Sequence, residues 1–312
     1  GRMRSWVASE GITLTAEHVA AHPVRERATD SVRAGLAAWL PALPLLLPAL
    51  FLLVLPTLTL ILGSVGLPGR LTLEHWVDTF QSNGGRQAIL TSIRLGLVCG
   101  LLSMLIGGPL AWFVSRMVTG SRSMWLALLN VAANFGGIGL AFGYMAALGT
   151  YGMVTLGLQE LGIPWVPPEI GSFASLVMAY LYTNIPLFVL LTLPAMAIVR
   201  QDWFEAAEVC KASRWQFWRY IGLPVLSPFL LAGFLLIFTW SIGIYGLAFA
   251  LGGSAAATGR LRLITLQIGI SLNSGVGTEE RSFVLATVLL ILAAAALLTY
   301  RRVMKRALRW FS

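Results

Sequence analysis

The sequence predicts an all-α protein with six membrane-spanning helices. Hydrophobic residues make up 57% of the 312 residues, charged residues make up 11%, and the mean hydropathy is +0.79. A soluble globule of this length would need more polar surface than that. Six apolar runs are each close to or longer than the ~20 residues with which a helix crosses a bilayer. The predicted spans are residues 37–65, 88–114, 124–149, 173–199, 223–250 and 283–301.

The positions of lysine and arginine predict the orientation of these helices, because cytoplasmic flanks retain positive charge. With the N-terminus inside, sixteen of the 22 basic residues fall in inner segments. The six outer ones are Arg70, Arg86, Arg94, Arg260, Arg262 and Arg281. Both termini are therefore expected in the cytoplasm. The net charge of +9 is explained by this topology and by contact with anionic membrane lipid, and no nucleic-acid partner is expected.

Two regions are expected along the chain. Residues 1–36 are polar and mixed in charge, and they lack the basic, then apolar, then small-residue pattern of a cleaved signal peptide. They are predicted to form a cytoplasmic tail, either an interfacial or regulatory helix or a solvated lead-in. Residues 37–312 form the membrane domain, which includes a cytoplasmic loop at 200–222.

This loop is polar, aromatic and basic, and it separates the fourth and fifth spans. Asp202 followed by Glu205, and Ser213 followed by Gln216, each match a capping box at a helix N-terminus. The segment is therefore predicted to form two short helices with a break near residues 210–212. A pair of helices in a cytoplasmic loop is suited to enter a cleft on a partner protein.

The same loop carries a family resemblance. Glu205-Ala206-Ala207, a usually glycine position held by Lys211, Ala212-Ser213, Ile221 and Leu223-Pro224 resemble the EAA loop of ATP-binding cassette importer permeases. The resemblance covers roughly residues 40–305. Upstream, Thr72-Leu73-Glu74-His75-Trp76, Thr91-Ser92-Ile93-Arg94-Leu95 and Gly107-Gly108-Pro109-Leu110-Ala111 look like the permeases for spermidine and putrescine, ferric iron, thiamine or phosphonates.

The resemblance implies a type I importer permease fold in the bacterial cytoplasmic (inner) membrane. It also implies three kinds of partner: nucleotide-binding ATPase subunits that bind ATP and Mg²⁺, an extracytoplasmic solute-binding protein, and a second permease subunit, with a heterodimer expected in preference to a homodimer. The residues that it assigns to ATPase coupling are Asp202, Glu205, Ala206, Ala207, Lys211, Ala212, Ser213, Trp215, Leu223 and Pro224.

Motifs for ATP hydrolysis and for proton coupling are not found in the sequence, which favours a transporter whose energy is supplied by a partner protein. The chain has no phosphate-binding loop of the Gly-x-x-x-x-Gly-Lys-[Ser/Thr] type, so no cofactor is expected in it and ATP hydrolysis is assigned elsewhere. Every acidic residue lies outside the predicted membrane cores, which argues against a proton relay. No catalytic cluster or metal-ligand spacing is found. The alternative is a six-span channel or facilitator that is not driven by ATP.

Polar and aromatic residues within the spans are candidates for the solute path. They are Asn134, Tyr182, Asn184, Trp240 and Tyr245. Each can either contact a solute or pack between helices, which is the common fate of an intramembrane amide. Arg94, near the outer end of the second span, is expected to contact a solute or a docked receptor, or to extend toward the lipid headgroups. Residues 260–272 have mixed helix and strand periodicity and are assigned to an outer loop or an interfacial segment.

Lys211 departs from the family pattern. A chain reversal between two short helices favours glycine, because a positive φ costs a residue with a Cβ about 1 kcal/mol. Either the break is shifted by one residue and the lysine side chain extends into water, or its ammonium group pairs with an acid on a partner ATPase.

Overall fold

The computed structural model describes residues 43–66, 71–273 and 279–308, and every regular element in these ranges is helical. The predicted tail at 1–36 lies outside them. The elements are α2 (Leu43–Ser64), α3 (Glu74–Gln81), α4 (Asn83–Ser115), α5 (Thr119–Asn134), α6 (Gly137–Leu148), α7 (Met153–Glu160), α8 (Phe173–Met196), α9 (Gln201–Val209), α10 (Arg214–Phe217), a π-helical turn η3 (Trp218–Gly222), α11 (Leu223–Gly243), α12 (Gly246–Ala257), α13 (Ile264–Asn273) and α14 (Glu279–Leu308).

Six helices in the described part of the chain are long and apolar enough to cross a membrane, which confirms the predicted count. They are Leu46–Ser64, Asn83–Ser115, Gly137–Glu160, Phe173–Met196, Arg214–Gly243 and Glu280–Lys305. The chain divides into two units, residues 1–57 and 58–312. The packing described below belongs to the second unit.

The prediction of one continuous span at 124–149 is wrong. Helix α5 ends at Asn134, Phe135 and Gly136 leave helical geometry, and α6 begins at Gly137 with φ of 68°. A positive φ is accessible to glycine because it has no Cβ. The apolar candidate span in this region is therefore shifted to Gly137–Glu160.

The predicted span at 223–250 is also broken. Helix α11 ends at Gly243, Ile244 takes an extended conformation (φ −72°, ψ 122°), and α12 starts at Gly246. The two breaks lie next to each other, since a Cβ built on Gly246 would be 3.7 Å from the Cα of Gly137. The following segment, for which the sequence left the structure open, forms the helix α13 and packs against α14.

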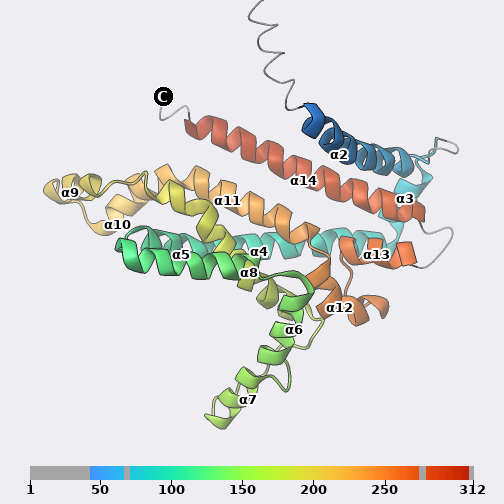
Figure 1. Ribbon diagram of the computed structural model, residues 1–312, viewed down its shortest axis with the longest axis horizontal. Helices are drawn as coiled ribbons and strands as arrows, with labels where there is room; N and C mark the ends of the chain where they lie inside the picture. Colours follow the sequence, from blue (N-terminus) through green and yellow to red (C-terminus); the bar gives the residue numbers. More distant parts are fainter. Residues whose placement is uncertain (1–42, 67–70, 274–278, 309–312) are drawn as a thin grey trace, which may run out of the picture. The chain divides into compact units, whose positions relative to one another are not determined.

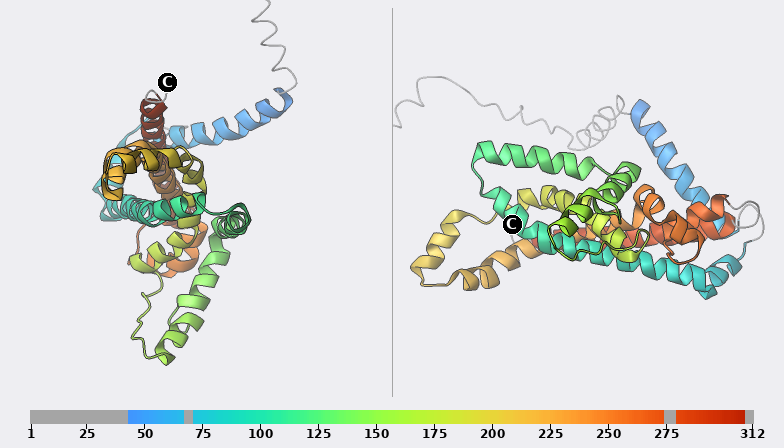
Figure 2. Two further views of the ribbon diagram at one scale, coloured as in Figure 1. Left: turned by 90° about the vertical axis from the view of Figure 1, so that its left-hand side faces the viewer. Right: turned by 90° about the horizontal axis from the view of Figure 1, so that it is seen from below.

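Helices α4, α8, α11 and α14 run side by side (Figures 1 and 2). Phe188 of α8 is fully buried where three of them meet. A Cβ on Gly107 of α4 or on Gly233 of α11 would come within 2.9 Å of its ring. Small residues let membrane helices approach closely, so these glycines allow α4 and α11 to close around one phenylalanine.

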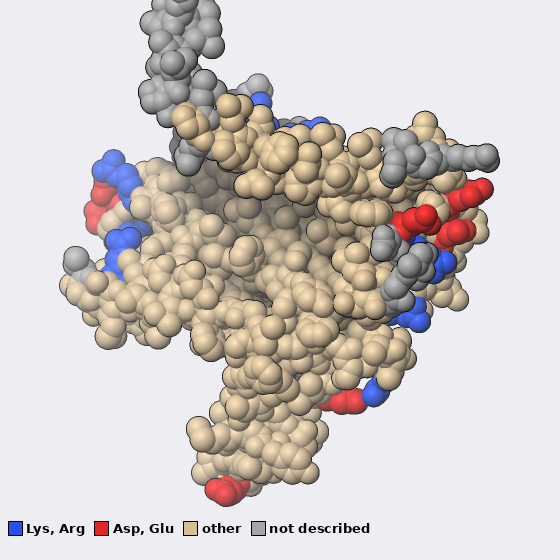
Figure 3. Space-filling model, turned by 45° about the vertical axis from the view of Figure 1, so that its right-hand side comes forward, with Lys and Arg blue, Asp and Glu red and all other residues tan. Residues whose placement is uncertain are grey.

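Different short helices lie at the two ends of the bundle formed by α4, α8, α11 and α14. Helices α9 and α10 lie at one end, and α3 and α13 lie at the opposite end (Figure 1). On the face drawn in Figure 3, charged side chains lie at the margins and the broad central area is free of them. This distribution is the one expected for a protein whose middle is surrounded by hydrocarbon.

Candidate functional site

The predicted pair of short helices is present, and we call α9, α10 and the turn between them the helix pair. The Ser213–Gln216 capping box is confirmed: Gln216 N donates to Ser213 Oγ (3.2 Å), and Ser213 N donates to Gln216 Oε1 (2.7 Å). The capping box expected at Asp202 is wrong. The N-cap lies two residues earlier, at Arg200, and Asp202 pairs with the Arg200 side chain from within the first turn, where a carboxylate interacts favourably with the helix dipole.

The turn of the helix pair is a Schellman motif with a lysine at its left-handed position. The Lys211 N–H donates to Glu208 O (2.9 Å) and the Ala212 N–H donates to Ala207 O (3.0 Å), the two bonds that close such a helix end. Lys211 has φ of 56° and is exposed. The break is therefore not shifted away from this residue, and the chain accepts the conformational cost that glycine would avoid.

An aromatic cluster ties the helix pair to the membrane helices. The rings of Phe204 (α9) and Phe217 (α10) lie 3.8 Å apart between centroids, and Trp218 meets Trp112 of α4 edge to face at 4.8 Å. Phe217 is buried, and the same cluster includes residues at the ends of α4, α8 and α11. Such contacts between rings are specific in geometry, so the helix pair is held in one orientation.

Arg116 reinforces this attachment. Its guanidinium carbon lies 4.1 Å from the centroid of the Trp112 ring, and its Nη2 donates to Val199 O at 2.6 Å. It therefore joins the end of α4 to the chain just beyond α8. The hydrogen bond and the cation–π contact are each favourable. The contact with Trp112 stays within the end of α4 and fixes the guanidinium group, and the hydrogen bond to Val199 links α4 to the end of α8 next to the helix pair.

The opposite face of the helix pair is open. Glu205, Ala206 and Glu208 are exposed, and two large apolar side chains, Val209 and Trp215, are 84% and 71% exposed. Ala207 faces partly inward and packs on the aromatic cluster. Exposed apolar side chains beside polar ones are typical of a surface that contacts a partner.

A π-helical turn that was not predicted follows the helix pair. The N–H of Leu223 donates to Trp218 O, five residues earlier, and Gly222 is buried against the Trp218 ring, 2.6 Å from the place of a Cβ. Pro224 has no N–H to continue the normal ladder. The Gly-Leu-Pro sequence is the one signal that could have indicated this distortion, because π-turns occur inside helices at sites of strain.

A cavity lies among α5, α8 and α11; most of its lining is apolar, and we call it the polar cavity after the four polar side chains that also line it. Its volume is about 640 Å³, and its polar lining side chains are Asn130, Asn134, Thr183 and Trp240. Two of the five predicted path residues, Asn134 and Trp240, thus come together here. Asn130 was missed, although its position one helical turn before Asn134 places the two amides on the same face of α5.

The other three predicted path residues lie elsewhere. Asn184 is fully buried and its Nδ2 donates to Ser241 Oγ at 2.9 Å, the interhelical arrangement that was the alternative to solute contact. Tyr182 meets Phe135 edge to face (6.3 Å) and lines a second cavity of about 600 Å³. Tyr245 stacks on Phe249 at 5.3 Å in a third cavity of about 260 Å³.

No group of three or more potential metal ligands of the His, Cys, Asp or Glu type is found within the residues that the structure describes. Of the two cysteines, Cys99 is buried and Cys210 is exposed, and both are free thiols.

Residues 92–309 match the model of the family described as binding-protein-dependent transport system inner membrane component. The chain belongs to this family. The match includes the helix pair, its aromatic cluster and the polar cavity, and it confirms the resemblance that the loop carries. The chain is also 25% identical over 169 residues to the spermidine/putrescine transport system permease protein PotB of Escherichia coli.

That alignment covers 54% of this chain and 62% of PotB, so the chain spans about six-tenths of the length of this relative. The molybdenum transport system permease protein ModB of Azotobacter vinelandii is 23% identical over 181 residues, which are 58% of this chain and 78% of ModB. A chain of a bacterial ABC transporter that imports the acidic polysaccharide alginate superposes with a TM-score of 0.62 at 17% identity, over 91% of this chain and 99% of that one. It supports the type I importer permease fold.

Proposed function

We propose that this chain is the permease subunit of an ATP-binding cassette importer and that it couples to a separate ATPase through the helix pair. The observation that carries the proposal is the two-sided construction of the pair. Its inner face is held by Trp112, Phe217 and Trp218, whereas Ala206, Val209 and Trp215 are exposed. A partner that binds the exposed face can move the helix pair, and the packed inner face transmits this movement to α4 and α8.

The route of that force follows from the contacts. Movement of α9 displaces Phe204 and with it the rings of Phe217 and Trp112. Arg116 carries the displacement to the end of α8 through Val199. Packed elements transmit motion as rigid bodies, and bending concentrates where helices are interrupted. The adjacent breaks at residues 135–136 and 244–245 are the places at which we expect this bending.

Membrane transporters commonly place solutes beside interrupted helices. The polar cavity adjoins both breaks, since Gly136, Gly137 and Ile244 line it. Its lining contains amides, a hydroxyl and an indole but no charged side chain. A second permease subunit, in a heterodimer, would close its open side. Solute contact by Asn134 and Trp240 is part of this proposal.

The names of the relatives do not select a solute. PotB is named for spermidine and putrescine, ModB for molybdenum and CysT of Escherichia coli for sulfate, and these cargoes differ in charge. The uncharged lining of the cavity favours no sign. We therefore assign the choice of solute to a separate extracytoplasmic binding protein. A structural neighbour of this chain, with a TM-score of 0.66 at 16% identity, was solved with an alginate-bound periplasmic protein.

The multi-pass chain belongs, in this proposal, to the bacterial cytoplasmic membrane, with the helix pair and both termini inside. ATP and Mg²⁺ are bound by the partner ATPase subunits. The competing function is an ATP-independent channel or facilitator. Co-purification of an ATPase and ATP-dependent uptake in proteoliposomes distinguish the two.

The decisive experiment uses Ala206→Asp, which adds charge to the exposed face of α9, and Thr258→Asp as its control at the exposed residue that follows α12. Both variants should insert normally. We expect the first to lose ATP-dependent uptake and ATPase co-purification and the second to keep both. Normal uptake by Ala206→Asp, or uptake by the wild type without any ATPase, would overturn the proposal.

A further inference from the structure

The helix pair continues into α11 without a loop. Residues Arg214–Gly243 form a single helical segment of 30 residues, in which the π-helical turn occupies Trp218–Gly222. Phe217 (φ −55°, ψ −52°) and Gly222 (φ −62°, ψ −55°) border or end this turn. Both stay within the scatter of about 15–20° that α-helices show. A change of angle between the helix pair and α11 at this turn therefore needs only small dihedral adjustments.

Pro224 explains why the turn lies at this point. In a regular α-helix, a proline ring clashes with the carbonyl group four residues earlier, which here belongs to Tyr220. The longer spacing of a π-turn relieves this clash. A second proline, Pro228, follows within α11, and there Ser227 Oγ donates to Pro224 O at 3.0 Å. This hydroxyl replaces the N–H that Pro228 lacks, so the helix is irregular before Pro224 and is repaired after it.

The Trp218 ring joins the turn to two other helices. It meets Trp112 of α4 edge to face at 4.8 Å between centroids, and it lies 6.1 Å from the Phe204 ring of α9. It also covers Gly222, where a Cβ would be 2.6 Å from its Cε3. Contacts between aromatic rings are specific in geometry. The helix pair therefore cannot change its angle to α11 without moving the Trp218 ring against Trp112.

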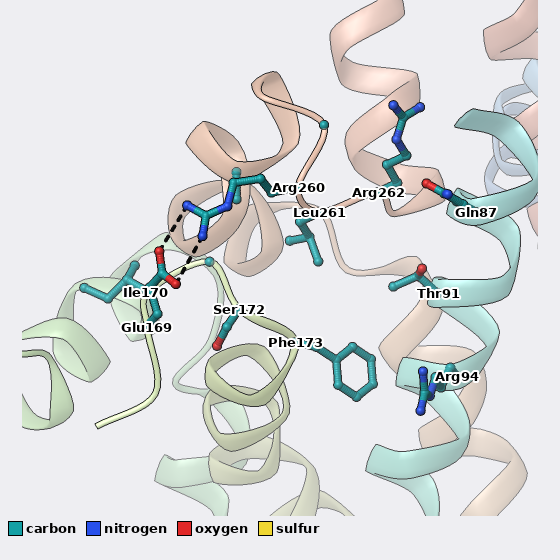
Figure 4. A pocket seen from close by; sticks show the side chains of 13 residues that line it. Gln87, Thr91, Arg94, Glu169, Ile170, Ser172, Phe173, Arg260, Leu261 and Arg262 are labelled. Atoms are coloured by element: carbon teal, nitrogen blue, oxygen red, sulfur yellow. Dashed lines mark hydrogen bonds and ion pairs between the residues drawn. The ribbon is translucent and has the colours of Figure 1, made fainter. Parts of the chain in front are cut away.

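The opposite end of the bundle is held by contacts between its loops and helices. Glu169, before α8, faces Arg260, before α13, with Oε1 3.1 Å from Nη1 and Oε2 3.2 Å from Nη2 (Figure 4). The buried N–H of Ile264 donates to Ser92 Oγ of α4 at 2.9 Å. Helix α11 itself packs against α4, α8 and α14. The π-turn is thus the first irregular point on the path from the helix pair into a packed bundle.

We propose that the π-turn is the pivot of the helix pair and that Trp218 is the positioning residue that sets its angle to α11. When the helix pair turns, the Trp218 ring presses on Trp112 and transmits the turn to α4, while α11 keeps its place. The alternative is a rigid lever, in which residues 214–243 move as one body. The use of the pivot in ATPase coupling rests on the proposed function, whereas the pivot itself is a property of this chain.

The test measures distances between two spin labels by double electron–electron resonance, in the full chain purified in a maltoside detergent without an ATPase. Val209→Cys with Leu231→Cys spans the π-turn and is called the joint pair. Val77→Cys with Leu231→Cys lies outside the helix pair and is called the bundle pair. All three side chains are exposed. The native cysteines are removed by Cys99→Ala and Cys210→Ser.

We expect Gly222→Ala, whose added methyl group displaces the Trp218 ring, to broaden the distance distribution of the joint pair. Trp218→Ala should broaden it too, and Trp218→Phe, which keeps a ring, should restore most of the wild-type width. Pro224→Ala supplies an N–H for a regular ladder and should shift the joint-pair distance. Pro228→Ala is its matched control and should not, because a hydroxyl already replaces the missing N–H. The bundle pair should stay unchanged in every variant.

Wild-type joint-pair distributions in Gly222→Ala, Trp218→Ala and Pro224→Ala would show a rigid lever and overturn the proposal. Equal broadening of the bundle pair would overturn it as well, because Trp218 would then stabilise the whole fold instead of positioning the helix pair. Neither result bears on the proposed transport function, because no ATPase is present and no uptake is measured.

Discussion

The hydroxyl group of Tyr180, which is buried in α8, donates a hydrogen bond of 3.2 Å to the carbonyl oxygen of Ile244, where the fifth predicted span breaks. An interrupted helix leaves carbonyl groups without their usual N–H partners. In hydrocarbon, irregular backbone persists only where other groups replace those partners. Tyr180 therefore stabilises the break between α11 and α12 from a neighbouring helix.

Tyr180→Phe should destabilise the folded protein without changing its shape. The loss of one buried hydrogen bond in a membrane bundle costs about 1 kcal/mol, which should lower the midpoint of denaturant unfolding in detergent micelles. Tyr182→Phe is the control, because Tyr182 is half exposed and no hydrogen bond of its hydroxyl is found among the described residues. Equal stability of both variants would show that the break does not depend on this bond.

The sequence was sufficient for the number of spans but not for their continuity. Hydropathy detects the apolar runs, because each must match the thickness of the bilayer. It does not detect the break at Ile244, because the neighbouring residues are apolar too. This break depends on the hydrogen bond from Tyr180 and on the close approach of Gly246 to Gly137. Gly136-Gly137 offered only a weak signal, since glycine pairs also occur where helices simply pack closely.

The helix pair was more predictable than the polar cavity for a physical reason. The Ser213–Gln216 capping box and the aromatic residues of the helix pair act within one short segment, so they can be recognised from residues that are close together in the sequence. The cavity depends on which faces of α5, α8 and α11 meet. Asn184 illustrates this. It is an asparagine within a predicted span, as Asn134 is, yet its side chain lies in the contact between α8 and α11 and donates a hydrogen bond to Ser241.

Asn134 and Asn184 should consequently respond differently to replacement. We expect Asn134→Ala, in the polar cavity, to change the KM for solute in ATP-driven uptake while the protein unfolds normally. Asn184→Ala removes the bond to Ser241 and should lower stability by about 1 kcal/mol with little change in KM. Uptake in proteoliposomes together with unfolding in detergent measures both quantities. The reverse pattern would move the solute path to Asn184.

The native cysteines test the topology directly. Cys210, in the turn of the helix pair, is exposed, whereas Cys99 is buried, and the chain has no others. A membrane-impermeant maleimide should label the protein in inside-out vesicles and not in intact cells. Cys210→Ser should abolish the labelling. Modification of the wild type from outside intact cells would contradict the cytoplasmic position of residues 200–222.

Lys211 gives the most specific prediction about the helix pair. Its φ of 56° closes the Schellman turn, a conformation that costs a residue with a Cβ about 1 kcal/mol relative to glycine. Lys211→Gly should therefore stabilise the turn by up to that amount, offset in part by the greater freedom of glycine in the unfolded chain. Lys211→Ala is the matched control, since it removes the charge but keeps the Cβ, and it should bring no gain.

The same variants separate conformation from charge at the partner surface. If the ammonium group pairs with an acid on the ATPase, Lys211→Gly and Lys211→Ala should both bind the ATPase more weakly than the wild type, and Lys211→Glu should bind more weakly still, because it places like charges together. If the side chain only extends into water, all four proteins should bind equally. Lys211 is exposed and its backbone closes the turn, which leaves its side chain available for either outcome, so the measured affinity for the isolated ATPase decides between them.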